Sequence, residues 1–391
     1  MKTQRLTELL TELIAVPSVN PAHGGPPEVV GERRMADHIA ALLRERGLEA
    51  EYRDYKGPER PAVVGTTPEV GGPTLMFELH LDTVGVANMT LDPFKAEIRD
   101  GRLTGRGSCD MKGSIAALFH ALTPERVRAL TERGVRLMVV GAPDEETGTH
   151  GARKLVEDGL RADVAVVLEP TRCRPVIAHK GARWYEMTLR GRGGHGSQPQ
   201  SGVSTNAALA ELLPRLFRLH DRIADEFRHP LLGVSTLNLG RIDGGHTFNL
   251  IPDHTLLQLD RRQVPGEPEG LFEQEVEALL DDLVRDGKLV GGDLRRTTYT
   301  EAFATDADGP LVRSMRDAIR DVTGVAPEPE GTSWVSDAAP LSRVCGETLV
   351  FGPGDIAQAH TSDEYIELDQ LETGAAVFAR FLDAFDPGAT R

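Results

Sequence analysis

Histidine and carboxylate side chains stand where several apolar runs of this sequence end. His80 closes the run TLMFELH and is followed by Asp82, and Glu169 closes the run DVAVVLE. Glu145 and Glu146 follow the run VRLMVVG through a short turn. Imidazole and carboxylate groups are ligands for divalent metal ions, and a carboxylate beside such a site also serves as a general base. These residue types therefore point to metal-assisted chemistry.

Two further side chains of the same types lie in turns. Asp110 lies in GRGSCDMKG, before an expected helix, and His360 follows the run ETLVFG through GPGDIAQA. Alone, Asp110 could be a helix N-cap and His360 a surface histidine. In open α/β sheets, however, ligands bind outside the carboxyl ends of the strands, so we expect two histidines and four carboxylates to share one crevice. Carboxylates this close repel one another, and a bound dication relieves the repulsion.

The elements that position these residues alternate between strands and helices. Short apolar runs are typical of strands covered on both faces, and intervening helices imply parallel pairing. Strands are expected at 74–80, 135–141, 163–168 and 347–352, and helices at 28–46, 111–122, 151–158, 309–323 and 368–385. The fold class predicted is α/β, a doubly wound, mainly parallel sheet.

The pattern changes in residues 180–294. Strands with alternating faces are expected within 184–193, 235–245 and 254–264, with helices at 204–220 and 268–286. We therefore predict a discontinuous catalytic α/β domain, residues 1–179 and 295–391, interrupted by an inserted α+β domain, residues 180–294.

The motif series resembles one metallopeptidase family along nearly the whole chain. The matching segments are HLDTV, GRGSCDMKG, PDEETG, LEPT, GGHGSQP and FGPGDIAQAHTSDEY. That family includes acetylornithine deacetylase, succinyl-diaminopimelate desuccinylase, carboxypeptidase G and aminoacylase. The resemblance implies a catalytic α/β domain with an inserted domain that acts as a lid and dimerises, which agrees with the architecture predicted from the residues.

The resemblance also implies a site for two divalent metal ions. Asp110 would bridge both ions, His80 and Glu169 would complete one site, and Glu146 and His360 the other. Imidazole and carboxylate ligands suit zinc, with cobalt or manganese as possible substitutes.

Catalytic roles follow from the same resemblance. Glu145 is expected to be the general base, because it neighbours a ligand without being one and could take a proton from a metal-activated water. Asp82 is expected to accept a hydrogen bond from His80 and so fix the orientation of that imidazole. A cis peptide bond is expected between Asp110 and Met111.

Substrate contacts are expected from four other residues. Arg262 shares a strand face with Asp260, and the resemblance implies that its guanidinium binds the substrate carboxylate. From the residues alone, a solvated surface arginine is an equally good explanation. His195, reaching the partner subunit's active site, would stabilise the oxyanion, and Asn249 and Thr332 would contact substrate. These roles imply a homodimer through the inserted domain.

The composition disfavours nucleic-acid-binding, membrane-spanning and disulfide-rich proteins. The chain has 391 residues, 60 acidic and 44 basic, with a net charge of −16, which disfavours binding to nucleic acid. No run approaches the ~18 apolar residues of a membrane span. Three cysteines are too few for a disulfide framework, and no signal-peptide pattern is evident, so a cytoplasmic location is expected.

Two rival patterns are weak. Residues 191–196, GRGGHG, match the dinucleotide-binding pattern, but Pro199 and a polar stretch follow where a helix should begin. No GxSxG segment of a serine hydrolase occurs in the chain.

The function expected is hydrolysis of the amide bond of N-acyl amino acids by a two-metal-activated water. The ending FGPGDIAQAHTSDEY looks closest to acetylornithine deacetylase and succinyl-diaminopimelate desuccinylase, which serve amino-acid biosynthesis. A dipeptidase or carboxypeptidase acting on short peptides is the alternative within the family. A catalytically silent dimeric binding protein is the alternative outside it, although Glu145 and all the expected ligands are present.

Overall fold

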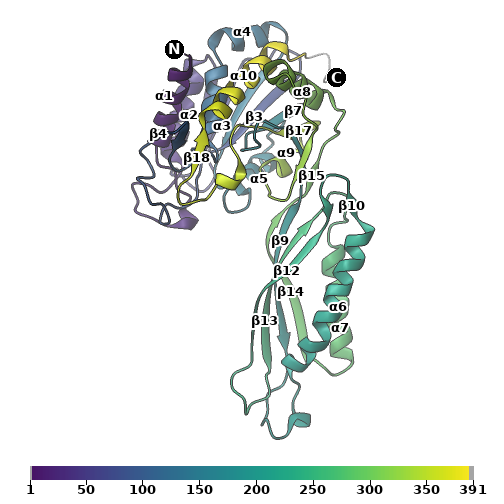
Figure 1. Cartoon of the computed structure of the whole chain (residues 1–391). Coiled ribbons are helices and arrows are strands. Elements are labelled where there is room, and N and C mark those ends of the chain that lie inside the picture. Colours follow the sequence, from purple (N-terminus) through teal and green to yellow (C-terminus); the bar gives the residue numbers. More distant parts are fainter. Residues whose placement is uncertain (1, 387–391) are drawn as a thin grey trace. The chain divides into compact units, whose positions relative to one another are not determined.

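The computed structural model describes residues 2–386, and these form two compact units (Figure 1). Unit 1 comprises residues up to 177, 304–331 and 336 onward, and unit 2 comprises 178–303 with 332–335. In the described part of the chain, no helix combines the length and apolar character that a membrane span requires.

A mainly parallel sheet forms the centre of unit 1. Its strand order is β1-β2-β6-β3-β7-β17-β8-β15, and β16 pairs with β8. The strands are β1 (Glu49–Arg53), β2 (Ala62–Thr66), β3 (Thr74–His80), β6 (Arg136–Ala142), β7 (Val164–Val167), β8 (Val176–His179), β15 (Phe303–Ala304), β16 (Glu330–Thr332) and β17 (Glu347–Val350). β6, β3, β7 and β17 are mutually parallel, whereas β1 and β2 join antiparallel. The predicted fold class is confirmed.

Helices cover both faces of this sheet. They are α1 (Lys2–Ile14), α2 (Arg33–Glu45), α3 (Lys112–Ala121), α4 (Pro124–Glu132), α5 (His150–Glu157), α8 (Pro310–Thr323), α9 (Ala338–Leu341) and α10 (Leu368–Ala384). α10 packs against α3 and α8, and α9 contacts α5, β7 and β17. A small sheet, β18 (Tyr365–Glu367), β5 (Arg102–Thr104) and β4 (Glu97–Arg99), and two 3₁₀ turns at Pro21–His23 and Ile356–Gln358 complete unit 1.

An aromatic cluster joins the central strand to the C-terminal helix. The ring of Phe378 on α10 lies 6.0 Å from that of Phe77 on β3 and 5.2 Å from that of Phe351, edge to face, and all three are fully buried. We expect Phe378→Ala to lower the free energy of unfolding by about 3–5 kcal/mol, because it removes the ring and leaves a cavity. Urea denaturation checks this value. A loss below about 1 kcal/mol would show that the cluster does not anchor α10.

Unit 2 is a four-stranded antiparallel sheet with two helices. The strand order is β12 (Thr236–Gly244), β13 (His254–Gln263), β9 (Gly181–Arg190) and β14 (Gly291–Thr300). α6 (Thr205–Glu226) and α7 (Leu271–Arg285) contact each other and lie along one side of this sheet (Figure 1). A hairpin of β10 (Arg228–His229) and β11 (Gly233–Val234) and a 3₁₀ turn at Pro199–Ser201 complete the unit.

One strand of the four-stranded sheet is absent from the sequence expectation. The predicted boundary between residues 294 and 295 falls inside β14, which forms an edge of the sheet. Apolar alternation is weak there, because Arg295 and Arg296 are paired with carboxylates on the solvent side instead of packing into a core.

Candidate metal centre

The strand register brings His80 and Glu169 together. β3 and β7 are parallel neighbours with Glu78 opposite Val167, so His80 and Glu169, each two residues further on, follow the same edge of the sheet. Both side chains are buried. The carboxyl ends of adjacent parallel strands thus supply the first two donors, as the sequence predicts.

Asp110 connects two donor groups. In the first group, ligand atoms of His80, Asp110 and Glu169 all lie within 4.8 Å of one another, and in the second, those of Asp110, Glu146 and His360 do. Oδ1 of Asp110 is 3.0 Å from Nε2 of His80, and its Oδ2 is 3.3 Å from Nε2 of His360. Each oxygen of one carboxylate therefore faces a different group, which suits a pair of ions sharing a bridging ligand.

Glu364 holds the turn that carries Asp110. Its carboxylate accepts hydrogen bonds from the backbone N–H groups of Gly107, Cys109 and Asp110 at 2.9–3.0 Å, and it pairs with Arg106 at 2.8 Å. Glu364 is fully buried and was not among the predicted site residues, although it lies in the matching segment TSDEY.

The peptide bond after Asp110, to Met111, is cis, as expected.

Asp82 supports His80 through its backbone and the segment of Glu145 and Glu146 through its side chain. Nδ1 of His80 donates to the backbone carbonyl of Asp82 at 2.9 Å, whereas the Asp82 carboxylate is 3.8 Å away. Asp82 therefore accepts the hydrogen bond from His80 through its backbone carbonyl and not through its carboxylate. Because a carbonyl only accepts, Nδ1 carries the proton, and Nε2 is left free to ligate. The carboxylate instead accepts the backbone N–H groups of Glu145 and Glu146, both at 3.1 Å.

Glu145, Glu146 and Glu169 are costly to hold in their charged form. Burial, followed by the charge of Glu169, raises the pKa of Glu145 well above its usual value. Burial and the charge of Asp110 raise the pKa of Glu146 to about 7. Hydrogen bonds to Asp110 and Glu146 raise the pKa of His360 to about 10. The positive charge of His360 is thus stabilised at this place, whereas the negative charges of Glu145 and Glu146 are not, and the donor set fits divalent cations.

Four predicted substrate contacts lie in unit 2. Arg262 pairs with Asp260 at 2.9 Å on one face of β13, while its neighbour Arg261 is buried on the other face. Nδ1 of His195 accepts the backbone N–H of Ser197. The carbonyl of Asn249 accepts the N–H of Gly196 at 2.8 Å, and that of Thr332 accepts the N–H of Lys180 at 3.1 Å. The substrate roles of these residues stay predictions.

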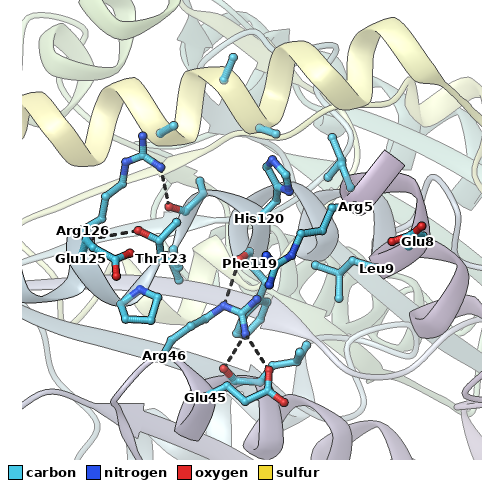
Figure 2. A pocket seen from close by; sticks show the side chains of 18 of the residues that line it. Arg5, Glu8, Leu9, Glu45, Arg46, Phe119, His120, Thr123, Glu125 and Arg126 are labelled. Atoms are coloured by element: carbon cyan, nitrogen blue, oxygen red, sulfur yellow. Dashed lines mark hydrogen bonds and ion pairs between the residues drawn. The ribbon is translucent and has the colours of Figure 1, made fainter. Parts of the chain in front are cut away.

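A groove elsewhere on unit 1 contains none of the predicted site residues. It has a volume of about 1060 Å³ and lies between α1, α2, α10 and the junction of α3 with α4. Its charged side chains are largely engaged: Arg46 pairs with Glu45 and donates to the carbonyl of Phe119 (Figure 2). Arg126 pairs with Asp383. The predicted metal ligands therefore lie in the two donor groups and not in this groove.

A mainly parallel α/β sheet with two ligand groups at the carboxyl ends of its strands is an arrangement of metal-dependent hydrolases. The chain belongs to peptidase family M20/M25/M40, whose model matches residues 76–384, and it is a hydrolase of C–N bonds.

Known proteins are similar to this chain over nearly its whole length. The acetylornithine deacetylase of Myxococcus xanthus is 34% identical over 395 residues, covering 98% of each chain. Among solved structures, the aminopeptidase PepT of Bacillus cereus is similar with a TM-score of 0.77 at 20% identity, covering 97% of this chain and 98% of that one. The YXEP protein of Bacillus subtilis, described as a dinuclear metal binding peptidase, is similar with a TM-score of 0.70 at 15% identity, covering 97% of each chain. Both structural likenesses concern the fold.

Proposed function

We propose that this protein is a two-metal amidohydrolase that removes the acyl group from N-acyl amino acids, as acetylornithine deacetylase and succinyl-diaminopimelate desuccinylase do. The observation that carries the proposal is the shared carboxylate of Asp110, whose two oxygens face two separate donor groups. The full-length similarity to an acetylornithine deacetylase supports this substrate class over that of a dipeptidase or carboxypeptidase.

The five residues of the two donor groups would serve as metal ligands. His80, Asp110 and Glu169 would hold one divalent ion, and Asp110 with Glu146 and His360 the other, with zinc expected and cobalt or manganese as substitutes. The bound ions would supply Lewis acidity and lower the pKa of a water molecule toward ~7.

Glu145 would move the proton. It belongs to neither donor group, and burial and the neighbouring charge of Glu169 raise its pKa, which makes its carboxylate a better proton acceptor. It would take a proton from the attacking water and deliver it to the leaving amine. Asp82 would hold Glu145 in place through the backbone.

Unit 2 would supply substrate recognition. Arg262 presents the fork geometry that binds a carboxylate with two hydrogen bonds, and here it makes two such bonds to Asp260. We assign the substrate carboxylate to Arg262, oxyanion stabilisation in a partner subunit to His195, and further substrate contacts to Asn249 and Thr332. A homodimer through unit 2, a lid function for that unit, a cytoplasmic location and a place in amino-acid biosynthesis belong to the same proposal.

Chelation tests the metal dependence. After dialysis against a chelator, hydrolysis of N-acetyl-L-ornithine should fall by at least about 100-fold, because the ions supply several kcal/mol of transition-state stabilisation. Zinc or cobalt should restore it. Magnesium is the control, because it prefers all-oxygen sites and should not replace an ion held by histidine. Full activity in the chelated protein would contradict a metal-dependent mechanism.

A substrate panel tests the acyl class. N-acetyl and N-succinyl amino acids should be hydrolysed with a higher kcat/KM than dipeptides. Faster cleavage of dipeptides would assign the protein to the peptidase alternative. Metal binding without hydrolysis of any member would favour the catalytically silent binding protein.

A further inference from the structure

Asn20 is buried at a point where two buried carboxylates meet. Its Nδ2 donates to Oδ2 of Asp82 at 2.7 Å and to Oδ1 of Asp144 at 2.8 Å. The three side chains come from segments 62 and 124 residues apart in the chain, and all three residues are almost fully buried. The amide group of Asn20 therefore donates one hydrogen bond to each of the two carboxylates and bridges them.

The rest of Asn20 is held by hydrogen bonds as well. Its Oδ1 accepts the backbone N–H of Ala22 at 3.0 Å, and its own backbone N–H donates to the carbonyl of Thr83 at 2.9 Å. The acceptor bond from Ala22 leaves only one amide orientation in which the NH₂ group points at the carboxylates. The donors therefore have a defined direction, which a flexible or purely space-filling residue would not provide.

Both carboxylates bound by Asn20 control the segment that carries Glu145 and Glu146. Asp82 accepts the backbone N–H groups of these two residues. Asp144 directly precedes them and has a positive φ of 64°, a conformation that Asp tolerates better than most residues. Its Oδ1 also accepts the hydroxyl of Thr147 at 2.8 Å, which closes the turn on its far side.

Asp144 is anchored from a third segment. Arg60 donates to Oδ1 of Asp144 at 2.9 Å and pairs with the buried carboxylate of Glu32. Tyr55 and Lys56 donate to its Oδ2 at 2.6 and 2.8 Å. Asp144 is therefore held by residues outside the site. Asn20, which donates to both carboxylates, orients Asp82 relative to Asp144.

We infer that Asn20 is a positioning residue, which sets the direction of Glu145 and Glu146 by bridging Asp82 and Asp144. This inference rests on the proposed function, since it gives Asn20 its role through a general base and a metal ligand. It assigns no contact with substrate to Asn20. Because the bridge acts on the carboxylate of Asp82, which accepts the N–H groups of Glu145 and Glu146, its loss should disturb the second donor group, which contains Glu146. The first group should change less, since His80 contacts only the backbone carbonyl of Asp82.

Asn20→Asp is the sharpest variant, because it keeps the size of the side chain and turns a donor facing two carboxylates into a third negative charge. We expect kcat for N-acetyl-L-ornithine to fall by about 10–100-fold, as when other partners of metal ligands are replaced, with KM nearly unchanged. Zinc titration with a competing chelator should show one ion held as in the wild type and the other weakened by at least about 10-fold. Asn20→Ser, which removes the amide without adding charge, carries the test if Asn20→Asp does not fold.

Thr67→Val is the matched control. Thr67 is buried in unit 1 and accepts the backbone N–H of Leu137 at 3.0 Å, so this variant also loses a buried hydrogen bond, away from the donor groups. The inference is overturned if the Asn20 variants keep both ions and a kcat within twofold of the wild type. It is also overturned if, at an equal loss of Tm, the kcat and zinc affinity of the Asn20 variants fall no further than those of Thr67→Val. A wild type without chelator-sensitive hydrolysis would instead contradict the proposed function, and the activity of the wild type before and after chelation reports this separately from the variants.

Discussion

Glu145→Gln should lower kcat by at least about 100-fold while leaving both divalent ions bound, because removing a general acid–base group costs about 10²–10⁴ in rate. Glutamine keeps the size of the side chain and loses the ability to take a proton. Glu145 lies outside both donor groups, so the substitution removes no expected ligand. A variant that binds both ions and yet turns over very little substrate would indicate that Glu145 transfers a proton.

Turnover and metal content should be measured on the same preparation. Glu157→Gln, the same exchange at an exposed position on α5, is the matched control and should behave as the wild type does. If Glu145→Gln kept its metal and a kcat within tenfold of the wild type, another group would have to move the proton. If it lost one ion, Glu145 would be a ligand instead of a base.

Asp110→Asn should have the larger effect. The substitution replaces one of the two charged oxygens that face His80 and His360 with an uncharged NH₂ group, which cannot ligate. We expect at least one ion to be lost and hydrolysis to fall by at least about 1000-fold, since metal ions contribute several kcal/mol and about 1.4 kcal/mol corresponds to a factor of ten.

Metal analysis by mass spectrometry after gel filtration checks this prediction. Asp158→Asn, at an exposed position after α5, is its control. Two ions retained by Asp110→Asn with normal turnover would show that the two groups do not depend on a shared carboxylate.

The parts of the site that the sequence predicts are those that depend on local pattern. Apolar runs reveal β3 and β7 because their strands are buried on both faces, and a ligand-type residue at the end of each run, His80 or Glu169, is therefore visible without a structure. Parallel pairing then places both residues at one edge of the sheet. This reasoning requires no knowledge of distant contacts.

The residues that support the site depend on distant contacts and could not be predicted in this way. Asn20 meets Asp82 and Asp144, which lie 62 and 124 residues away in the chain, and no local pattern around Asn20 or Asp144 reveals this contact. Whether His80 donates to the carbonyl or to the carboxylate of Asp82 depends on the path of the backbone after β3. The order of residue types along the chain does not reveal that path. The sequence pattern does not reveal the polar edge strands β1 and β14 for a related reason, since much of their surface is exposed to solvent and their apolar alternation is weak.

The most direct test of the two-metal centre is anomalous scattering at the zinc edge from crystals of the zinc-loaded protein. We expect two peaks about 3.5–4 Å apart, one on each side of Asp110, the first beside His80 and Glu169 and the second beside Glu146 and His360. A single peak, or no peak among these side chains in the presence of excess zinc, would contradict a two-metal centre.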